Sequence, residues 1–140
     1  MNIVLDTNVL VSGLLSPFSA PGEIVRMIAS GQLRLCVDAR ILWEYSAVLK
    51  RPRFQFQPDL VAEFLSFIEE GAFFAAGVPL RHPLPDHDDE PFLEVAVAAQ
   101  ADALVTGNRR HFPPRACGAM RVLTPTEFIA FYRRRMAPGT

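Results

Sequence analysis

The sequence has few cysteines and no long apolar run. The first feature argues against a disulfide-rich or zinc-binding protein, and the second against a membrane-spanning one. Its two cysteines, Cys36 and Cys117, lack the paired spacing of a zinc site or a disulfide framework, so we interpret them as packed thiols. Although half of the residues are hydrophobic, no apolar run reaches the roughly 18 residues of a membrane span. The first residues show neither a basic segment nor a small-residue cleavage site, so we expect a cytoplasmic protein.

An excess of charge of one sign is also lacking. The net charge of −1 excludes a uniformly basic surface, yet thirteen of the fourteen basic residues are arginines that cluster at 51–53, 109–110 and 133–135. Such clusters can hold phosphate groups locally. The last cluster falls at the end of a predicted helix, where arginines complement the helix dipole, and we prefer that interpretation for it.

Hydrophobic periodicity predicts strands that alternate with helices along the chain. Strands are predicted at 2–6, 33–37, 72–76, 103–106 and 121–123. Helices are predicted at 9–15, 21–30, 39–50, 58–71, 90–100 and 125–135. This order predicts a single α/β domain over residues 1–140, with a central parallel sheet of four to five strands and helices on both faces. Such sheets place their sites at the carboxyl ends of the strands.

Two isolated acids fall at positions from which a carboxylate can reach a cleft. Asp6 ends the first predicted strand, although an Asp there can also simply cap the following helix. Glu44 lies just outside the apolar stripe of its predicted helix, from where it can reach inward or bend into water. Neither residue alone decides between these interpretations.

A third acidic segment, 86–90, carries four carboxylates in five residues directly before a predicted buried helix. That number exceeds what helix capping needs. Two unit charges about 4 Å apart repel by roughly 4 kcal/mol at an effective dielectric of 20. A site that joins Asp6, Glu44 and Asp89 would therefore need a cation, and a set of ligands made only of oxygen suits Mg²⁺ or Mn²⁺.

Four motifs together resemble the PIN domain. They are Asp6-Thr7-Asn8-Val9-Leu10 after a strand, Glu44 in a third helix, Asp-x-Asp-Asp-x-x-Phe-Leu-Glu-x-Ala at 86–96, and Leu-Val-Thr-Gly-Asn-x-x-His-Phe-Pro at 104–113. The resemblance runs from Asn2 to about Phe131. It is greatest to the PIN-family toxins of toxin–antitoxin systems, which are similar to the ribonuclease toxins of the virulence-associated protein C type. The resemblance implies a three-layer α/β/α sandwich.

The resemblance also implies a metal-dependent endoribonuclease that uses Mg²⁺ or Mn²⁺, held by Asp6, Glu44 and Asp89. At the fourth acidic position of many members this chain has Asn108, which weakens the case for a second metal ion. Asn108 is still expected to take part in catalysis, because its carbonyl oxygen can bind the cation or orient a water. Supporting roles are expected for Thr7, Asn8, Asp86 and Thr106. The expected contacts to RNA phosphates are Arg53, Arg109, Arg110 and His111, although His111 can equally be a loop histidine bonded to backbone.

Two partners besides RNA are expected. The apolar segments 9–15 and 21–29, with Phe54, Phe56, Phe64 and Phe67, offer more hydrophobic surface than one small core consumes, which favours a homodimer. An antitoxin protein is implied by the resemblance alone.

Two other functions compete with the ribonuclease. One is a catalytically inactive PIN-like module that binds a protein or RNA, with Asn108 as the sign of lost activity. The other is a phosphatase with Asp6 as its nucleophile, which is disfavoured because no second Asp stands two residues on.

Overall fold

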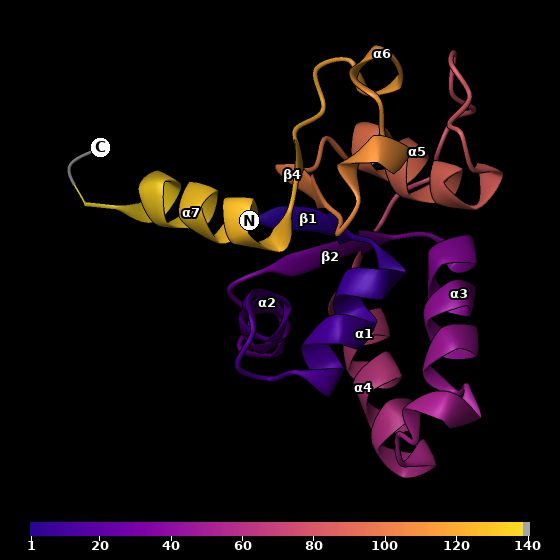
Figure 1. The fold of residues 1–140 in the computed structure, drawn as a ribbon, viewed down its shortest axis with the longest axis vertical. Helices are drawn as coiled ribbons and strands as arrows, with labels where there is room; N and C mark the ends of the chain where they lie inside the picture. Colours follow the sequence, from indigo (N-terminus) through magenta and orange to yellow (C-terminus); the bar gives the residue numbers. More distant parts are fainter. Residues whose placement is uncertain (139–140) are drawn as a thin grey trace.

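The computed structural model describes residues 1–138 and contains a five-stranded parallel sheet (Figure 1). Its strands follow the order β3-β2-β1-β4-β5. They are β1 (Asn2–Leu5), β2 (Arg34–Val37), β3 (Phe73–Phe74), β4 (Ala103–Val105) and β5 (Val122–Leu123). Every neighbouring pair is parallel, which confirms the predicted sheet.

Helices cover both faces of the sheet. They are α1 (Thr7–Leu15), α2 (Ala20–Ala29), α3 (Ala39–Leu49), α4 (Pro58–Gly71), α5 (Glu90–Ala99), α6 (Pro114–Cys117) and α7 (Pro125–Met136). In Figure 1, α5 lies above the sheet while α1, α2 and α4 lie below it, which gives the expected three-layer α/β/α sandwich. No helix in the described residues is long and apolar enough to cross a membrane.

Short helices in the loops were not predicted, because segments of three or four residues are too short to show a hydrophobic period. Besides α6, these are the 3₁₀ turns η1 (Pro52–Phe54), η2 (His87–Asp89) and η3 (Arg109–His111). The predicted strand 72–76 is also shorter in the structure. It forms only β3, whose two phenylalanines are both exposed at the edge of the sheet.

Local sequence signals start or end several helices where expected. The Asp38 side chain accepts a hydrogen bond of 3.0 Å from the backbone N of Ile41 and so caps α3. Thr124 and Glu127 form a reciprocal capping box at the start of α7. Gly31 follows α2 with a φ of +81°, a left-handed conformation that glycine adopts without strain.

The core lies on both sides of β1, whose residues Ile3, Val4 and Leu5 have no exposed surface. This burial follows from the central place of β1 between two helical layers. Cys36 on β2 is also fully buried, and burial raises the pKa of its thiol to about 11. Both cysteines are free and buried, which confirms that they are packed thiols.

The order of the strands decides where a site can form. From β1 the chain adds β2 and β3 on one side and then returns to add β4 and β5 on the other. The carboxyl ends of β1 and β4 therefore flank the point where the direction of winding reverses, which is where α/β sheets form crevices.

Candidate active site

Asp6 lies at this switch point, directly after β1. Its backbone N donates to the carbonyl oxygen of Val105 at 2.9 Å, so the ladder between β1 and β4 continues up to the site. The side chain is only 6% exposed, and its Oδ2 accepts a hydrogen bond of 2.8 Å from Thr106 Oγ1. Asp6 occupies the N-cap position of α1, and hydrogen bonds from the backbone of Asn8 and Thr7 act to lower the pKa of its carboxylate. Asp6 is therefore placed both to face the switch point and to contact the first turn of α1.

Thr106 fixes the Asp6 carboxylate from the neighbouring strand. The register pairs Leu5 with Val105, which places the two following residues side by side. The Thr106 hydroxyl is fully buried and also accepts a hydrogen bond of 3.1 Å from the backbone N of Asn108. One hydroxyl therefore links the Asp6 carboxylate to the loop that follows β4.

Glu44 reaches the same end of the sheet from α3. It is partly buried, and its Oε2 accepts a hydrogen bond from Thr7 Oγ1, so the carboxylate is held at the start of α1 rather than by water alone. The next residue, Tyr45, donates its hydroxyl to the carbonyl oxygen of Leu5 at 2.6 Å. That buried bond anchors α3 to the end of β1, and sequence reasoning did not identify it because it spans two distant elements.

Asp89 brings a third carboxylate from the turn before α5. It stands at the N-cap position of α5 but makes no capping hydrogen bond, and its side chain is 14% exposed. Its Oδ2 is buried without a hydrogen-bond partner among residues 1–138, while His111 Nδ1 lies 3.1 Å away as an ion-pair neighbour. A buried carboxylate oxygen without a hydrogen bond is costly and calls for a partner.

The helices that carry Glu44 and Asp89 are joined by one arginine. Arg40 on α3 contacts Asp38 at 2.7 Å and Glu94 on α5 at 3.0 Å. Glu94 is buried, so the ion pair it forms is shielded on one side from solvent. This link fixes α3 against α5 near the three carboxylates.

The three carboxylates share an electrostatic environment that disfavours their ionised forms. Burial, then the charge of Asp6, raises the pKa of Asp89 to about 6, and the neighbouring His111 opposes this rise. Burial raises the pKa of Glu44, and the charge of Asp6 adds to it. Burial also raises the pKa of Asp6, against the hydrogen bond from Thr106. The end of the sheet thus concentrates negative charge.

This arrangement fits a hard divalent cation in donor type and in charge. The donors are carboxylate oxygens, and the buried Oδ2 of Asp89 has no hydrogen bond within residues 1–138. As placed in residues 1–138, however, no three His, Cys, Asp or Glu side chains form a preassembled group that could hold a metal ion. Asp6, Glu44 and Asp89 are the residues that would hold one.

Other predicted residues are engaged elsewhere. Asn108 is exposed, and its Oδ1 accepts from the backbone N of Arg110 at 3.2 Å, so this side chain caps its own 3₁₀ turn. Asn8 is exposed, and its side chain makes no hydrogen bond within the described residues. Asp86 is exposed and caps η2 through the backbone N of Asp88 at 2.9 Å.

The basic side chains predicted to contact RNA differ in whether another group of the protein already binds them. Arg109 pairs with Glu127 at 3.2 Å, and the Arg53 guanidinium lies 4.8 Å from the centroid of the Phe54 ring. Arg110 is exposed and its guanidinium has no partner within residues 1–138. Sequence reasoning missed Arg51, whose charge lowers the pKa of Glu44, although it belongs to the cluster at 51–53.

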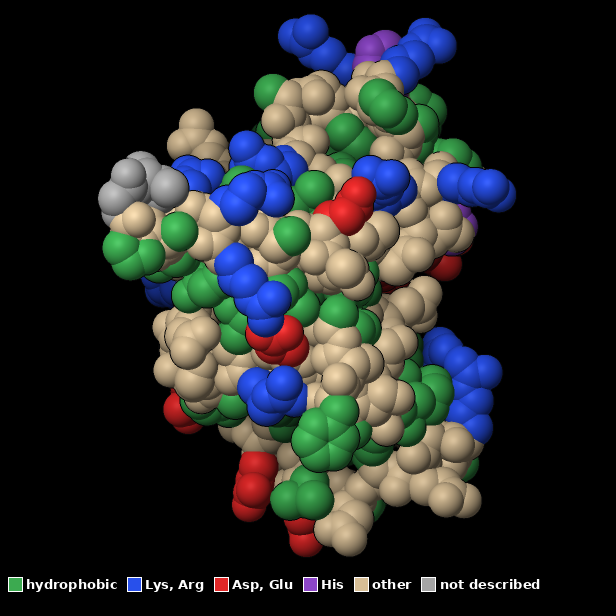
Figure 2. All heavy atoms as spheres, turned by 60° about the vertical axis from the view of Figure 1, so that its left-hand side comes forward, with side chains coloured by type: hydrophobic (Ala, Val, Ile, Leu, Met, Phe, Trp, Pro, Cys, Tyr) green, Lys and Arg blue, Asp and Glu red, His purple; other side chains and the backbone are tan. Residues whose placement is uncertain are grey.

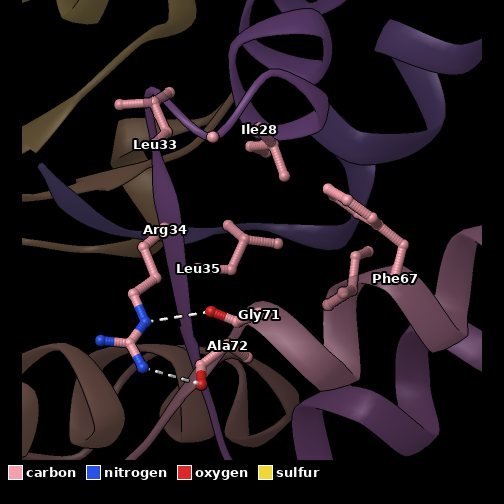
Figure 3. Close-up of a pocket in the computed structure, with 9 residues that line it drawn as sticks. Ile28, Leu33, Arg34, Leu35, Phe67, Gly71 and Ala72 are labelled. Carbon is pink, nitrogen blue, oxygen red and sulfur yellow. Dashed lines mark hydrogen bonds between the residues drawn. The ribbon is translucent and has the colours of Figure 1, made fainter.

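A separate pocket of about 210 Å³ lies between α2, β2 and α4 (Figure 3). Its walls include Leu35 and Phe67, and its charged residue is Arg34. The Arg34 guanidinium donates to the carbonyl oxygens of Gly71 at 3.0 Å and Ala72 at 3.5 Å. Because the Arg34 guanidinium already donates to backbone carbonyl oxygens, it is not available to bind a ligand in this pocket. The three carboxylates therefore remain the candidate active site.

Comparison with known families places this chain beside one of them. The family model described as PIN domain matches residues 2–110, a range that contains Asp6, Glu44, Asp89 and the turn after β4. No curated protein matches the chain.

Proposed function

This chain belongs to the PIN-domain family, and from that premise we propose that it is a metal-dependent endoribonuclease, the toxin of a type II toxin–antitoxin system. PIN domains are generally metal-dependent nucleases. The observation that supports catalytic activity in this chain is the buried Asp89 oxygen without a hydrogen bond, next to two other carboxylates of raised pKa. A divalent cation would give this oxygen a ligand contact in addition to its ion-pair neighbour His111.

In this proposal Asp6, Glu44 and Asp89 hold Mg²⁺ or Mn²⁺. When bound, the cation supplies the positive charge that favours attack of water on the phosphodiester. Thr106 and Thr7 orient two of the carboxylates through their hydroxyl groups. Water adds its oxygen to phosphorus and the bond to the 3′-oxygen breaks, so the products carry a 5′-phosphate and a 3′-hydroxyl. Arg110 and His111 would contact the RNA phosphates next to Asp89.

The test is cleavage of a fluorescently labelled single-stranded RNA by the purified protein. We expect cleavage in Mg²⁺ or Mn²⁺, loss to background when a chelator is added, and recovery when Mn²⁺ is restored. Circular dichroism in chelator should show an unchanged fold, because the core does not depend on the site. Cleavage that persists in chelator would contradict the metal mechanism.

An inactive RNA-binding module is the second candidate. It is favoured by Asn108, whose side chain caps its own turn, and by the absence of a preassembled group of three ligands in residues 1–138. The same experiment separates the two functions, since an inactive module would bind the RNA without shortening it in any divalent metal.

The proposal includes a homodimer and an antitoxin partner, with the chain acting in the cytoplasm. Large apolar side chains are exposed, with Phe18 at 98%, Trp43 at 73% and Leu60 at 58%. If these side chains form one patch, contact with another protein would cover it. Sedimentation is expected to show a dimer at micromolar concentration, and a monomer at high micromolar concentration would contradict it.

A further inference from the structure

Basic and acidic side chains are separated along this chain. Residues 103–138 carry seven arginines and a single acid, Glu127, whereas α4 carries four acids and no basic residue. In Figure 2, basic and histidine side chains gather at the end of the molecule where Figure 1 places α6 and the loop beside it. The net charge of −1 is therefore the sum of a strongly basic segment and acidic segments elsewhere in the chain.

Three arginines in or beside this region have no bonding partner among the residues that the structure describes. Arg81, Arg110 and Arg115 are exposed, and in residues 1–138 their guanidinium groups have no hydrogen bond, ion pair or ring contact. By contrast, Arg26 donates to the carbonyl oxygen of Pro17. An arginine without a protein partner keeps all its donors for an external phosphate.

Shared cavity walls show that these side chains form one continuous surface. A cavity of about 690 Å³ is lined by Arg81, His82 and Arg115. A second, of about 320 Å³, is lined by His82, Pro113 and Arg115. A third, of about 650 Å³, is lined by Pro113 and Arg110. We call the surface formed by Arg110, Arg115, His82 and Arg81 the basic ridge.

The basic ridge is adjacent in sequence to the candidate active site. Arg110 directly precedes His111, whose Nδ1 lies 3.1 Å from Asp89 Oδ2. From there the ridge crosses α6 and reaches the loop between β3 and η2. A phosphate chain bound at the carboxylates would therefore meet further cations as it leaves the site.

The cavity beside the basic ridge is lined mostly by apolar residues, which we call its apolar floor. The 690 Å³ cavity is also lined by Leu80, Val97 and Met120, and Val97 on α5 is 51% exposed. The acid in its wall, Glu94, is paired with Arg40 at 3.0 Å. Single strands bind to surfaces that combine cations for the backbone with apolar contacts for unpaired bases, whereas a duplex presents mainly its phosphates.

We propose that the basic ridge binds the part of a single-stranded RNA that extends beyond the cleavage site. Arg110, Arg115 and Arg81 contact successive phosphates, and the apolar floor contacts the bases between them. This inference rests on the proposed function for its substrate. Binding itself needs neither metal nor cleavage.

The test measures RNA binding to the full chain in chelator, where no cleavage is expected. The probe is a fluorescein-labelled oligouridine of about 12 nucleotides, a length within the range of single-strand sites. For an Arg81→Ala/Arg115→Ala double variant, loss of two phosphate contacts should reduce the slope of log affinity against log salt by about 1.4. Affinity at about 0.1 M salt should fall about tenfold.

A matched control removes the same charge elsewhere. Arg26 on α2 and Arg133 on α7 bond protein groups, Arg133 pairing with Glu23 at 3.1 Å. The Arg26→Ala/Arg133→Ala variant should keep the wild-type slope. Equal slopes for the two double variants, or a loss of affinity confined to duplex RNA, would overturn the ridge. Both variants are first checked for wild-type thermal unfolding, which exposed positions should preserve.

The result is separable from that of the cleavage assay. If the wild-type protein never cleaves RNA but the Arg81→Ala/Arg115→Ala variant binds RNA with a smaller salt dependence, the result supports the ridge. The same result contradicts the proposed enzyme. A protein that cleaves RNA but binds it equally well without these arginines contradicts the ridge alone.

Discussion

The Asp89→Asn variant is expected to be more stable than the wild-type protein in metal-free buffer and to lose RNA cleavage. Burial, then the charge of Asp6, raises the pKa of Asp89 from 3.8 to about 6. Such a rise corresponds to about 3 kcal/mol, which solvent screening reduces to about 1–2 kcal/mol. Cleavage should fall by more than about a hundredfold, because losing a metal ligand exceeds the usual cost of losing an outer partner.

The gain in stability should depend on pH in one direction. Since the folded protein holds the Asp89 proton more tightly than the unfolded chain, the loss of stability from ionising Asp89 is absent below pH 3.8. It builds up between pH 3.8 and about 6 and is complete above that. The stability difference between variant and wild type should therefore be largest at about pH 7.5 and shrink as the pH falls toward 4. Urea unfolding across this range measures it.

Asp86→Asn is the matched control for Asp89→Asn. Asp86 is an exposed carboxylate of the same segment, and its role as a cap of η2 is one that Asn also fills. That variant removes the same charge and should change stability little. Mn²⁺ should raise the unfolding temperature of the wild type and of Asp86→Asn but not of Asp89→Asn. An unchanged Mn²⁺ shift in Asp89→Asn would remove Asp89 from the site.

The Thr106→Val variant is expected to lower cleavage by about 10- to 100-fold and the free energy of unfolding by about 1–3 kcal/mol. Val keeps the shape of the side chain but removes the donor to Asp6 Oδ2 and the acceptor for the backbone N of Asn108. Because the bond from Thr106 lowers the pKa of Asp6, its loss should raise that pKa further. The acidic limb of the pH profile of kcat/KM should then move to higher pH.

Thr106→Ser serves as the rescue variant, since it restores the hydroxyl group at the cost of one methyl group. It should recover most of the cleavage and return the pH profile to that of the wild type. If Thr106→Val cleaved RNA like the wild type, the hydroxyl would have no part in orienting Asp6. If Ser failed to restore the pH profile, the effect would come from packing alone.

The sequence by itself determined the local features of this protein. Apolar periodicity located the five strands, and the alternation with helices indicated a parallel sheet. The caps at Asp38 and Thr124 followed from short-range chemistry, because each side chain bonds a backbone group three residues on. Motif spacing also led to the PIN-domain family. Such features depend on neighbours within a few residues, which the sequence displays directly.

Only the tertiary structure decided which distant groups meet. Strand order placed β4 beside β1, so that the Thr106 hydroxyl binds a carboxylate one hundred residues away. Packing turned Glu44 toward Thr7, and it paired Arg109 with Glu127, while Arg110 has no partner within residues 1–138. Hydrogen bonds and ion pairs between remote residues depend on register and on the angles at which helices pack. The sequence carries no direct signal for either, so the partners of each charge emerged only with the fold.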